Sequence, residues 1–243
     1  MSALLEITDA TKVFGGVRAV DGASLSVGAN TITALIGPNG SGKTTLFNLI
    51  TGYLRPDRGR VQFAGRDVTG MDAGSLYRRG LSRTFQQARV FPQLSVQENL
   101  VVAGGYTWRQ LFTRRVSSSD RNRAGQLLAE FNLAPVADLL ASELSYGQRK
   151  LLEFAAVLMS DPKLVLLDEP TAGVNPVMID TMERHVRDRH AAGITFLIVE
   201  HDMSFVMRLC DPVIVLDQGK PIFSGRPSDV QTNPLVLDAY LGS

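Results

Sequence analysis

The sequence predicts an α/β fold with a largely parallel sheet, an antiparallel β subdomain at the N-terminus and a helical insert. Three observations carry this prediction. A glycine-rich loop joins an apolar run to a helix near residue 40, strand signals fade from about Ala88 to Ser160, and apolar runs alternate with helical stretches from Leu164 onward. Short buried strands that alternate with helices are typical of a parallel sheet covered on both faces.

The N-terminal segment, residues 3–28, predicts antiparallel strands because short apolar runs are separated by turn residues. Phe14 falls at the tip of such a hairpin, just before Gly15 and Gly16. Taken alone, Phe14 would be an ordinary core aromatic. Further strands are expected at residues 61–63 and ending near residues 82–85, immediately before Gln86 and Gln87.

The glycine-rich loop spans residues 37–44 and reads GPNGSGKT, between the apolar run 32–36 and a helix that begins near Lys43. Strand, glycine loop and helix form the context that a phosphate-binding loop requires. Glycines let successive N–H groups turn toward one concavity, and the helix adds its dipole. Lys43 can then reach the outer phosphates, and the Thr44 hydroxyl can ligate an accompanying Mg²⁺.

The middle of the chain has helical spacing at residues 96–103, 124–131 and 148–159. Within it, five arginines surround the serines 117–119: Arg109, Arg114, Arg115, Arg121 and Arg123. Such a cluster is most often a solvated loop. From Leu164, apolar strands are expected at 164–167, 194–199 and 213–216, separated by helices at 177–190 and 203–210. A surface hairpin near 217–220 and a terminal helix follow.

The composition fits one large domain, or one domain with a subdomain, since the chain has 243 residues and is 44% hydrophobic. The formal net charge of +1 gives no general attraction to nucleic acid, and no nucleic-acid partner is expected. Cys210 is the only cysteine, which fits a reducing compartment. No apolar stretch approaches the roughly 18 residues that a membrane span needs, and we expect neither secretion nor a membrane span.

A second site follows the apolar run 164–167, which ends in Asp168 and Glu169. A carboxylate at this sheet edge can hold Mg²⁺ through its water shell, and the next one can orient and polarise an attacking water. We therefore interpret Asp168 as a metal partner and Glu169 as a general base. Alone, the pair could equally be an acidic turn, but together with the glycine loop it indicates a metal and catalytic site.

Residues 144–148, LSYGQ, decide the family. Ser145 can cap the helix that follows, and Gly147 lets that helix approach an anion closely. Together with Phe14, the glycine loop, Gln86, Asp168, Glu169 and His201 in this order, the chain closely resembles the nucleotide-binding subunit of an ATP-binding-cassette (ABC) transporter. The resemblance spans nearly the whole length and implies a P-loop NTPase fold: an ATP-binding core at 1–87 and 161–243, and a helical subdomain at 88–160.

The resemblance also implies roles for individual residues. Phe14 matches the aromatic that stacks on adenine, Gln86 the glutamine that touches Mg²⁺ and senses the membrane subunits, and His201 the histidine at the γ-phosphate. The implied catalytic residues are Glu169, His201 and Lys43, and the implied metal ligands are Thr44, Gln86 and Asp168. The implied ATP-binding residues are Phe14, Gly37, Asn39, Gly40, Ser41, Gly42, Lys43, Thr44, Thr45, Gln86, Ser145, Gly147 and Gln148.

In this family the site is composite, so Ser145 and Gly147 would serve the nucleotide of the opposite subunit in a head-to-tail dimer. Two positions depart from the family pattern: Tyr146 replaces the usual second glycine, and Asn175 stands where most members have aspartate. Asparagine keeps an acceptor but loses the charge, so communication between the two sites could differ. Neither departure is read as inactivating.

A closer resemblance rests on the segments RTFQ at 83–86, VQENL at 96–100, AGVNP at 172–176 and LDAYLG at 237–242. These are similar to the ATPase of branched-chain amino acid importers, although related subunits serve urea and other small polar solutes. The resemblance implies ATP hydrolysis at the cytoplasmic face of the membrane, integral permease partners, a second identical or similar ATPase and, indirectly, a solute-binding protein. The sequence itself identifies no transported solute.

Two other classes remain as alternatives. A soluble cassette ATPase in translation or DNA repair usually carries two cassettes or a long coiled-coil insertion, and this chain has neither. A regulatory module without turnover would lack Glu169 or His201, and both are present. A GTPase would need a guanine-reading Asn-Lys-x-Asp segment, which is not found.

Overall fold

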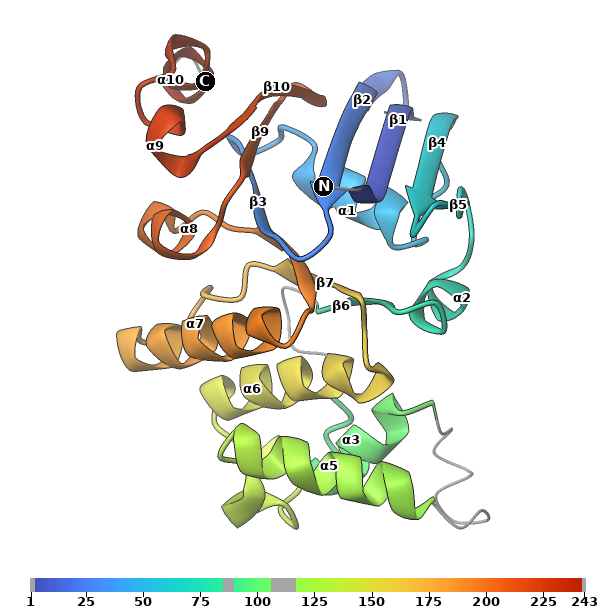
Figure 1. The fold of residues 1–243 in the computed structure, drawn as a ribbon, viewed down its shortest axis with the longest axis vertical. Coiled ribbons are helices and arrows are strands. Elements are labelled where there is room, and N and C mark those ends of the chain that lie inside the picture. The colour runs from blue at the N-terminus through green and yellow to red at the C-terminus, as the bar shows by residue number, and fades with distance from the viewer. Residues whose placement is uncertain (1–2, 85–89, 106–116, 242–243) are drawn as a thin grey trace.

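The computed structural model describes residues 3–84, 90–105 and 117–241, and it contains two β-sheets with helices packed against them (Figure 1). One sheet has four strands in the order β2-β1-β4-β5, and the other has six in the order β10-β9-β3-β8-β7-β6. The predicted α/β class, with an antiparallel N-terminal sheet and a largely parallel second sheet, is confirmed.

The four-stranded sheet is antiparallel throughout its described pairs. Phe14 pairs with Val17 across the Gly15-Gly16 turn, so Phe14 lies at the tip of the first hairpin as predicted. Leu5 and Ile7 of this sheet pack with Phe47 of the first helix in one apolar cluster. The strands are β1 (Ala3–Phe14), β2 (Val17–Gly28), β4 (Arg58–Phe63) and β5 (Arg66–Asp67).

The six-stranded sheet has parallel pairs except for β10, which runs antiparallel to β9. Every residue of β3, β7 and β8 is buried, as continuous apolar runs require when helices cover both faces of a sheet. The strands are β3 (Ile32–Ile36), β6 (Leu81–Arg83), β7 (Leu164–Asp168), β8 (Thr195–Val199), β9 (Val213–Asp217) and β10 (Lys220–Gly225).

The helices α3, α5 and α6 gather at the end of the molecule opposite the four-stranded sheet (Figure 1). The helix predicted at 96–103 is found at those bounds. The α-helices are α1 (Lys43–Ile50), α2 (Ala73–Tyr77), α3 (Val96–Ala103), α5 (Ser118–Glu130), α6 (Tyr146–Val157), α7 (Pro176–Ala191), α8 (Met203–Leu209), α9 (Pro227–Val230) and α10 (Pro234–Leu241). Short 3-10 turns are η1 (Ala134–Val136), η2 (Ala141–Glu143) and η3 (Leu158–Ser160).

Helix α5 begins earlier than the sequence predicts. Ser117 is its N-cap and accepts a 3.1 Å hydrogen bond from the N–H of Asp120. The side chains of Ser117 and Asp120 therefore start the helix six residues before the apolar periodicity does. Interpreting this whole cluster as a loop was wrong for the helical Arg121 and Arg123. Its other arginines, Arg109, Arg114 and Arg115, lie outside the described residues.

Two apolar clusters cover the larger sheet. One contains Phe131 and Phe154 from the helical region with Phe196 of β8, and the other contains Phe47 and Phe63 on the side of the four-stranded sheet. The larger sheet is therefore packed between two close-packed apolar layers, which fix the positions of its strand ends. Among residues 3–84, 90–105 and 117–241, none of the helices combines the length and apolar character needed to cross a bilayer.

Candidate functional site

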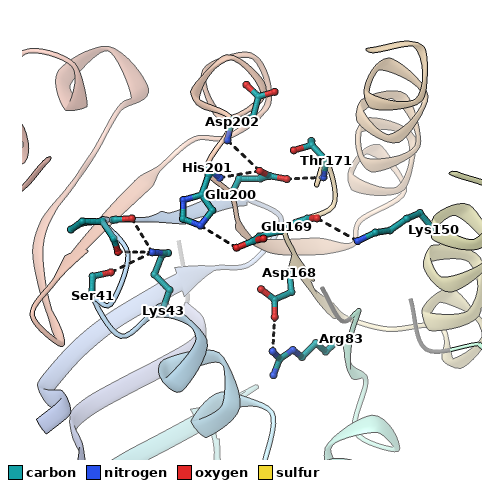
Figure 2. A network of polar contacts seen from close by, with 12 residues as sticks. Ser41, Lys43, Arg83, Lys150, Asp168, Glu169, Thr171, Glu200, His201 and Asp202 are labelled. Carbon is teal, nitrogen blue, oxygen red and sulfur yellow. Dashed lines mark hydrogen bonds and ion pairs between the residues drawn. The ribbon is translucent and has the colours of Figure 1, made fainter. Parts of the chain in front are cut away.

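The candidate site forms where three neighbouring strands of the larger sheet end. Leu35 of β3 and Asp168 of β7 both lie opposite Val199 of β8 in the parallel register. The segments that follow these strands therefore meet at one edge: the glycine-rich loop after β3, Glu169 after β7, and His201 shortly after β8. Figure 2 shows these three segments converging.

The backbone of the glycine-rich loop is closely surrounded. A Cβ on Gly37 would lie 2.1 Å from the Leu216 carbonyl oxygen, and one on Gly42 would lie 2.3 Å from that of Ala19. Gly42 has φ 103° and precedes α1, whose first turn has no side-chain cap. Uncapped N–H groups at a helix start are an anion-binding feature, so this loop can hold a phosphate.

Lys43 lies within this loop and is 6% exposed. Its Nζ donates 2.8 Å hydrogen bonds to the carbonyl oxygens of Gly37 and Pro38 and lies 3.5 Å from Ser41 Oγ. Burial lowers the pKa of the Lys43 ammonium, and the negative charge of Glu169 opposes that shift. The ammonium is thus held against the loop by backbone oxygens, on the side that faces Glu169.

Glu169 and His201 contact each other directly. His201 Nε2 lies 3.0 Å from Glu169 Oε1, and the two side chains are 44% and 20% exposed. Glu169 has a left-handed backbone with φ 48°, and its N–H donates to the Val199 carbonyl. The structure therefore brings the three predicted catalytic residues, Lys43, Glu169 and His201, to one partly solvated edge (Figure 2).

Asp168 is 6% exposed, and its side chain forms an ion pair that the sequence analysis missed. Arg83 Nη2 donates a 2.6 Å hydrogen bond to Asp168 Oδ2. The same guanidinium donates through Nη1 to Asn48 Oδ1 at 2.6 Å and to Thr51 Oγ1 at 3.1 Å. Arg83 thereby joins Asp168 to the helix that follows the glycine loop. An arginine inside a predicted strand indicates that its charge has a partner, but the sequence does not show that this partner is Asp168.

The residues near the loop fit a metal bound together with phosphate. Asp168 supplies carboxylate oxygens, and Thr44 presents an exposed hydroxyl-bearing side chain at the first turn of α1; hard oxygen donors suit Mg²⁺. In the described part of the chain, no three His, Cys, Asp or Glu side chains form a metal-binding group. Gln86, the third predicted ligand, lies outside the described residues.

Phe14 is 45% exposed at the tip of the β1-β2 hairpin. Lys12 Nζ lies 5.6 Å from the centroid of its ring. The same hairpin reaches the glycine loop, because Gly42 packs against Ala19 of β2. The core role considered from the sequence alone is excluded by this exposure, and the ring is available for stacking.

Ser145, Gly147 and Gln148 lie at the start of α6. Ser145 Oγ accepts from the Gln148 N–H at 3.2 Å, and Gln148 Oε1 accepts from the Ser145 N–H at 2.9 Å, so the predicted Ser145 cap is present. In Figure 1, α6 packs with the other helices of the lower half, whereas α1 lies beside the four-stranded sheet. Among the described residues, no hydrogen bond joins Ser145, Gly147 or Gln148 to Lys43.

Tyr146, which departs from the family pattern, contacts the loop after Glu169. Its hydroxyl donates a 3.2 Å hydrogen bond to the Ala172 carbonyl, and its ring carbon Cε1 lies 3.2 Å from the position that a Cβ on Gly173 would take. Asn175 ends this loop as the N-cap of α7, accepting from the Met178 N–H at 2.9 Å. An aspartate could make the same cap, so the cap alone does not require asparagine.

Two buried charged residues near the site were also missed by the sequence analysis. Glu200 is 2% exposed and accepts three backbone hydrogen bonds. Lys150 of α6 is 2% exposed, and its Nζ lies 3.5 Å from the Glu169 carbonyl oxygen. Charged side chains are almost never this buried without partners, but the sequence alone does not show which positions are buried.

Comparisons with known proteins agree with this arrangement. The family model described as ABC transporter matches residues 20–172. The branched-chain amino acid transport ATP-binding protein BraF of Pseudomonas aeruginosa is 37% identical, with 98% of each chain covered. The corresponding LivG proteins of Methanocaldococcus jannaschii and Escherichia coli K12 are 38% and 37% identical over 98% of this chain and 97% and 98% of their own.

Solved structures lead to the same family. A nucleotide-free ATP-binding cassette from an ABC transporter superposes with a TM-score of 0.89 at 36% identity, and the ADP conformation of such a cassette does so with a TM-score of 0.89 at 37% identity. Both matches cover 100% of this chain and 100% of the solved chain. The P-loop NTPase fold is thereby confirmed, and the chain belongs to the ABC transporter family as one of its ATP-binding, ATP-hydrolysing subunits.

Proposed function

We propose that this chain powers an ABC importer for branched-chain amino acids. The observation that carries the ATPase part is the contact between Glu169 Oε1 and His201 Nε2 beside the loop that holds Lys43. The choice of cargo rests on the relatives, which match this chain over nearly their whole length and are named as branched-chain amino acid transport ATP-binding proteins.

In the proposed reaction, the loop N–H groups and Lys43 bind the phosphates of ATP. The Glu169 carboxylate accepts a proton from a water whose oxygen attacks the γ-phosphorus, and the bond to ADP breaks as the new P–O bond forms. His201 contacts the γ-phosphate and, through its hydrogen bond, orients Glu169. Positioning and charge stabilisation therefore supply the catalysis.

The remaining predicted contacts complete the nucleotide site. Phe14 stacks on adenine, and the ATP-binding group of the loop is Gly37, Asn39, Gly40, Ser41, Gly42, Thr44 and Thr45. A bound Mg²⁺ would supply positive charge that neutralises the negative charge developing in the reaction. Thr44 and Asp168 would hold this ion, with Gln86 as a further ligand.

Two subunits close head to tail in this proposal. Ser145, Gly147 and Gln148 stand at the capped start of α6, in the helical half of the molecule, whereas the glycine loop precedes α1 beside the four-stranded sheet. A helix N-terminus favours anions, so this one would contact the γ-phosphate held by the partner. The partner subunit is a second ATPase of identical or similar sequence.

Integral permease subunits complete the transporter, with this chain attached peripherally at the cytoplasmic face and a solute-binding protein engaged indirectly. We assign residues 1–87 and 161–243 to the ATP-binding core and residues 88–160 to a helical subdomain. The helices of that subdomain and the Gln86 segment would transmit closure of the dimer to the permease.

The test is to tag this chain at its native level, solubilise membranes gently and identify what co-purifies. Uptake of labelled leucine, isoleucine and valine is measured in the same cells and in cells carrying Glu169→Gln. Co-purification of multi-span permeases, with leucine uptake lost in the variant, supports the proposal. If permeases co-purify but Glu169→Gln abolishes urea uptake and leaves leucine uptake unchanged, the cargo would be urea rather than a branched-chain amino acid. If no membrane protein co-purifies with the chain, the importer assignment would be refuted.

A further inference from the structure

Glu200, directly after β8, joins the two loops that carry the candidate catalytic side chains. Its Oε1 accepts a 2.8 Å hydrogen bond from the N–H of Thr171, in the loop that follows Glu169. Its Oε2 accepts from the N–H groups of His201 and Asp202, at 2.9 and 3.3 Å. One carboxylate therefore bonds both loops, with a different oxygen for each (Figure 2).

The chemistry of a carboxylate suits this position. An ionised carboxylate only accepts hydrogen bonds, and its two oxygens can serve several N–H donors at once. Hydrogen bonds from backbone N–H groups to a charged acceptor are shorter and stronger than neutral ones. Glu200 is 2% exposed, so these bonds replace hydration that the buried charge has lost.

Lys150 of α6 supplies positive charge to the same buried region. Burial lowers the pKa of its ammonium, and the carboxylates of Glu153, Glu200, Asp168 and Glu169 each oppose that shift. Lys150 Nζ also lies 3.5 Å from the Glu169 carbonyl oxygen. Lys150 therefore places a positive charge on the α6 side of this region, near enough to attract the Glu200 carboxylate.

The geometry of the catalytic pair depends on the relative position of these loops. Glu169 and His201 meet through a single 3.0 Å contact between side chains that are partly exposed. One side-chain hydrogen bond of this kind makes only a small net contribution to stability, which is little to fix the separation of two loops. Glu200 bonds the backbone two residues after Glu169 and the backbone of His201 itself.

We propose that Glu200 is a positioning residue for ATP hydrolysis, one that holds the Glu169 loop and the His201 loop at the separation the reaction needs. This inference rests on the proposed catalytic roles of Glu169 and His201. Glu200 takes no part in binding nucleotide or moving a proton; it acts through the backbone of Thr171 and His201.

The decisive variant is Glu200→Gln, which preserves the size of the side chain. Its amide oxygen can accept from one loop, but its NH₂ group opposes the N–H donors of the other. The matched control is Glu153→Gln, which makes the same change in another buried carboxylate near Lys150. Glu153 is 5% exposed and lies on α6 rather than on either loop.

Two measurements are made on the whole chain. Hydrogen exchange of the nucleotide-free protein is expected to be faster at the Thr171 or His201 amide in Glu200→Gln, by roughly tenfold for one lost charged hydrogen bond. Steady-state kinetics are expected to show a kcat lower by about 10- to 100-fold, because small misplacements of reacting groups slow the chemical step. The KM for ATP is expected to change little. Glu153→Gln is expected to change neither quantity.

Unchanged loop exchange, or faster exchange with wild-type kcat, would overturn the positioning role. Equal effects in Glu153→Gln would also overturn it, because they would reflect general destabilisation. The proposed function fails separately: if Glu169→Gln turned over ATP at the wild-type rate, the catalytic assignment would be wrong. The exchange measurement needs no turnover and still reports on the link made by Glu200.

Discussion

Arg83 and Asp168 form a buried ion pair in which Nη2 and Oδ2 lie 2.6 Å apart, with the two side chains 6% and 8% exposed. Arg83 lies in β6 and Asp168 at the end of β7, so the pair crosses two adjacent strands. Arg83 is further held by Asn48 and Thr51 of the segment that follows the glycine loop. The carboxylate of Asp168, a predicted Mg²⁺ ligand, is therefore held in place by its ion pair with Arg83.

Removing this arginine should destabilise the fold strongly. Arg83→Met leaves the Asp168 charge buried without its partner, which typically costs about 3–5 kcal/mol of unfolding free energy. Urea denaturation followed by circular dichroism measures the change. Arg18→Met, which breaks the exposed contact of Arg18 with Asp21, is the control and should leave the denaturation midpoint unaltered. A similar midpoint for Arg83→Met and wild type would mean that the pair does not stabilise the fold.

ATP binding should weaken at alkaline pH in a way that depends on Lys43. Burial lowers the pKa of this ammonium in the free protein, while bound phosphates favour its charged form. The affinity for ATP therefore falls as pH rises through the lowered pKa, below the usual lysine value of 10.5. Fluorescence titration with a nucleotide analogue across that range measures the affinity.

Lys43→Arg distinguishes deprotonation at position 43 from other effects of alkaline pH on ATP binding, because a guanidinium stays protonated throughout the accessible pH range. Binding by this variant should be nearly independent of pH, even if it is weaker overall. The exposed Lys163→Arg serves as the matched substitution and should keep the wild-type pH profile. A profile for Lys43→Arg that falls in parallel with wild type would assign the titration to another group.

Acid should destabilise the chain through His185. Its ring stacks on Phe131 with centroids 4.1 Å apart, and its Nε2 is buried without a hydrogen bond to the described residues. Burial and the nearby Arg184 lower its pKa below 6.5, against a smaller opposing effect of Asp188. The unfolded chain then binds more protons, so stability is full above pH 6.5 and falls as pH decreases toward the folded pKa.

The melting temperature, measured from above that pH down into the acid range, checks the direction. His185→Leu keeps an apolar side chain against Phe131 and removes the titrating group. The variant should lose less stability than wild type as the pH is lowered. Identical slopes in the two proteins would exclude His185 as the source of the acid sensitivity.

Glu169→Gln should separate ATP binding from turnover. The amide keeps the size of the side chain but does not take a proton from water, so kcat should fall by about 10²–10⁴-fold, the usual contribution of a general base. Retained ATP should favour the closed dimer, detected by light scattering. Glu183→Gln, in an ion-paired carboxylate of α7, should turn over ATP normally. Wild-type turnover in Glu169→Gln would remove this residue from its role.

Much of the fold follows from local sequence. The apolar run before the glycine loop becomes the buried β3, and the Ser145 cap starts α6 as its side chain predicts. The start of α5 was missed because its first six residues, SSDRNR, are all polar and hide the apolar period, although Ser117 followed by Asp120 three residues later is a local capping pattern.

The site was only partly predictable for a physical reason. Lys43 could be proposed from the glycine-rich loop that contains it, whereas Glu169 was proposed in combination with that loop and His201 through the family resemblance. Arg83 and Glu200 gain their roles from contacts across the sheet, with Asp168 and with Thr171. Long-range pairing of this kind leaves no periodic signal, and only the folded sheet shows which charges are buried together.

The position of β3 in the middle of the sheet also governs when the chain can first hold a nucleotide. Ile32 pairs with Phe196 and Ala34 with Val213, and the N–H of Gly219 donates to the Ser41 carbonyl at 2.9 Å. A growing chain on the ribosome makes the loop sequence long before β8, β9 and Gly219 are synthesised. Such non-local pairing slows folding, so a nascent subunit gains its affinity for ATP only after these later segments have emerged.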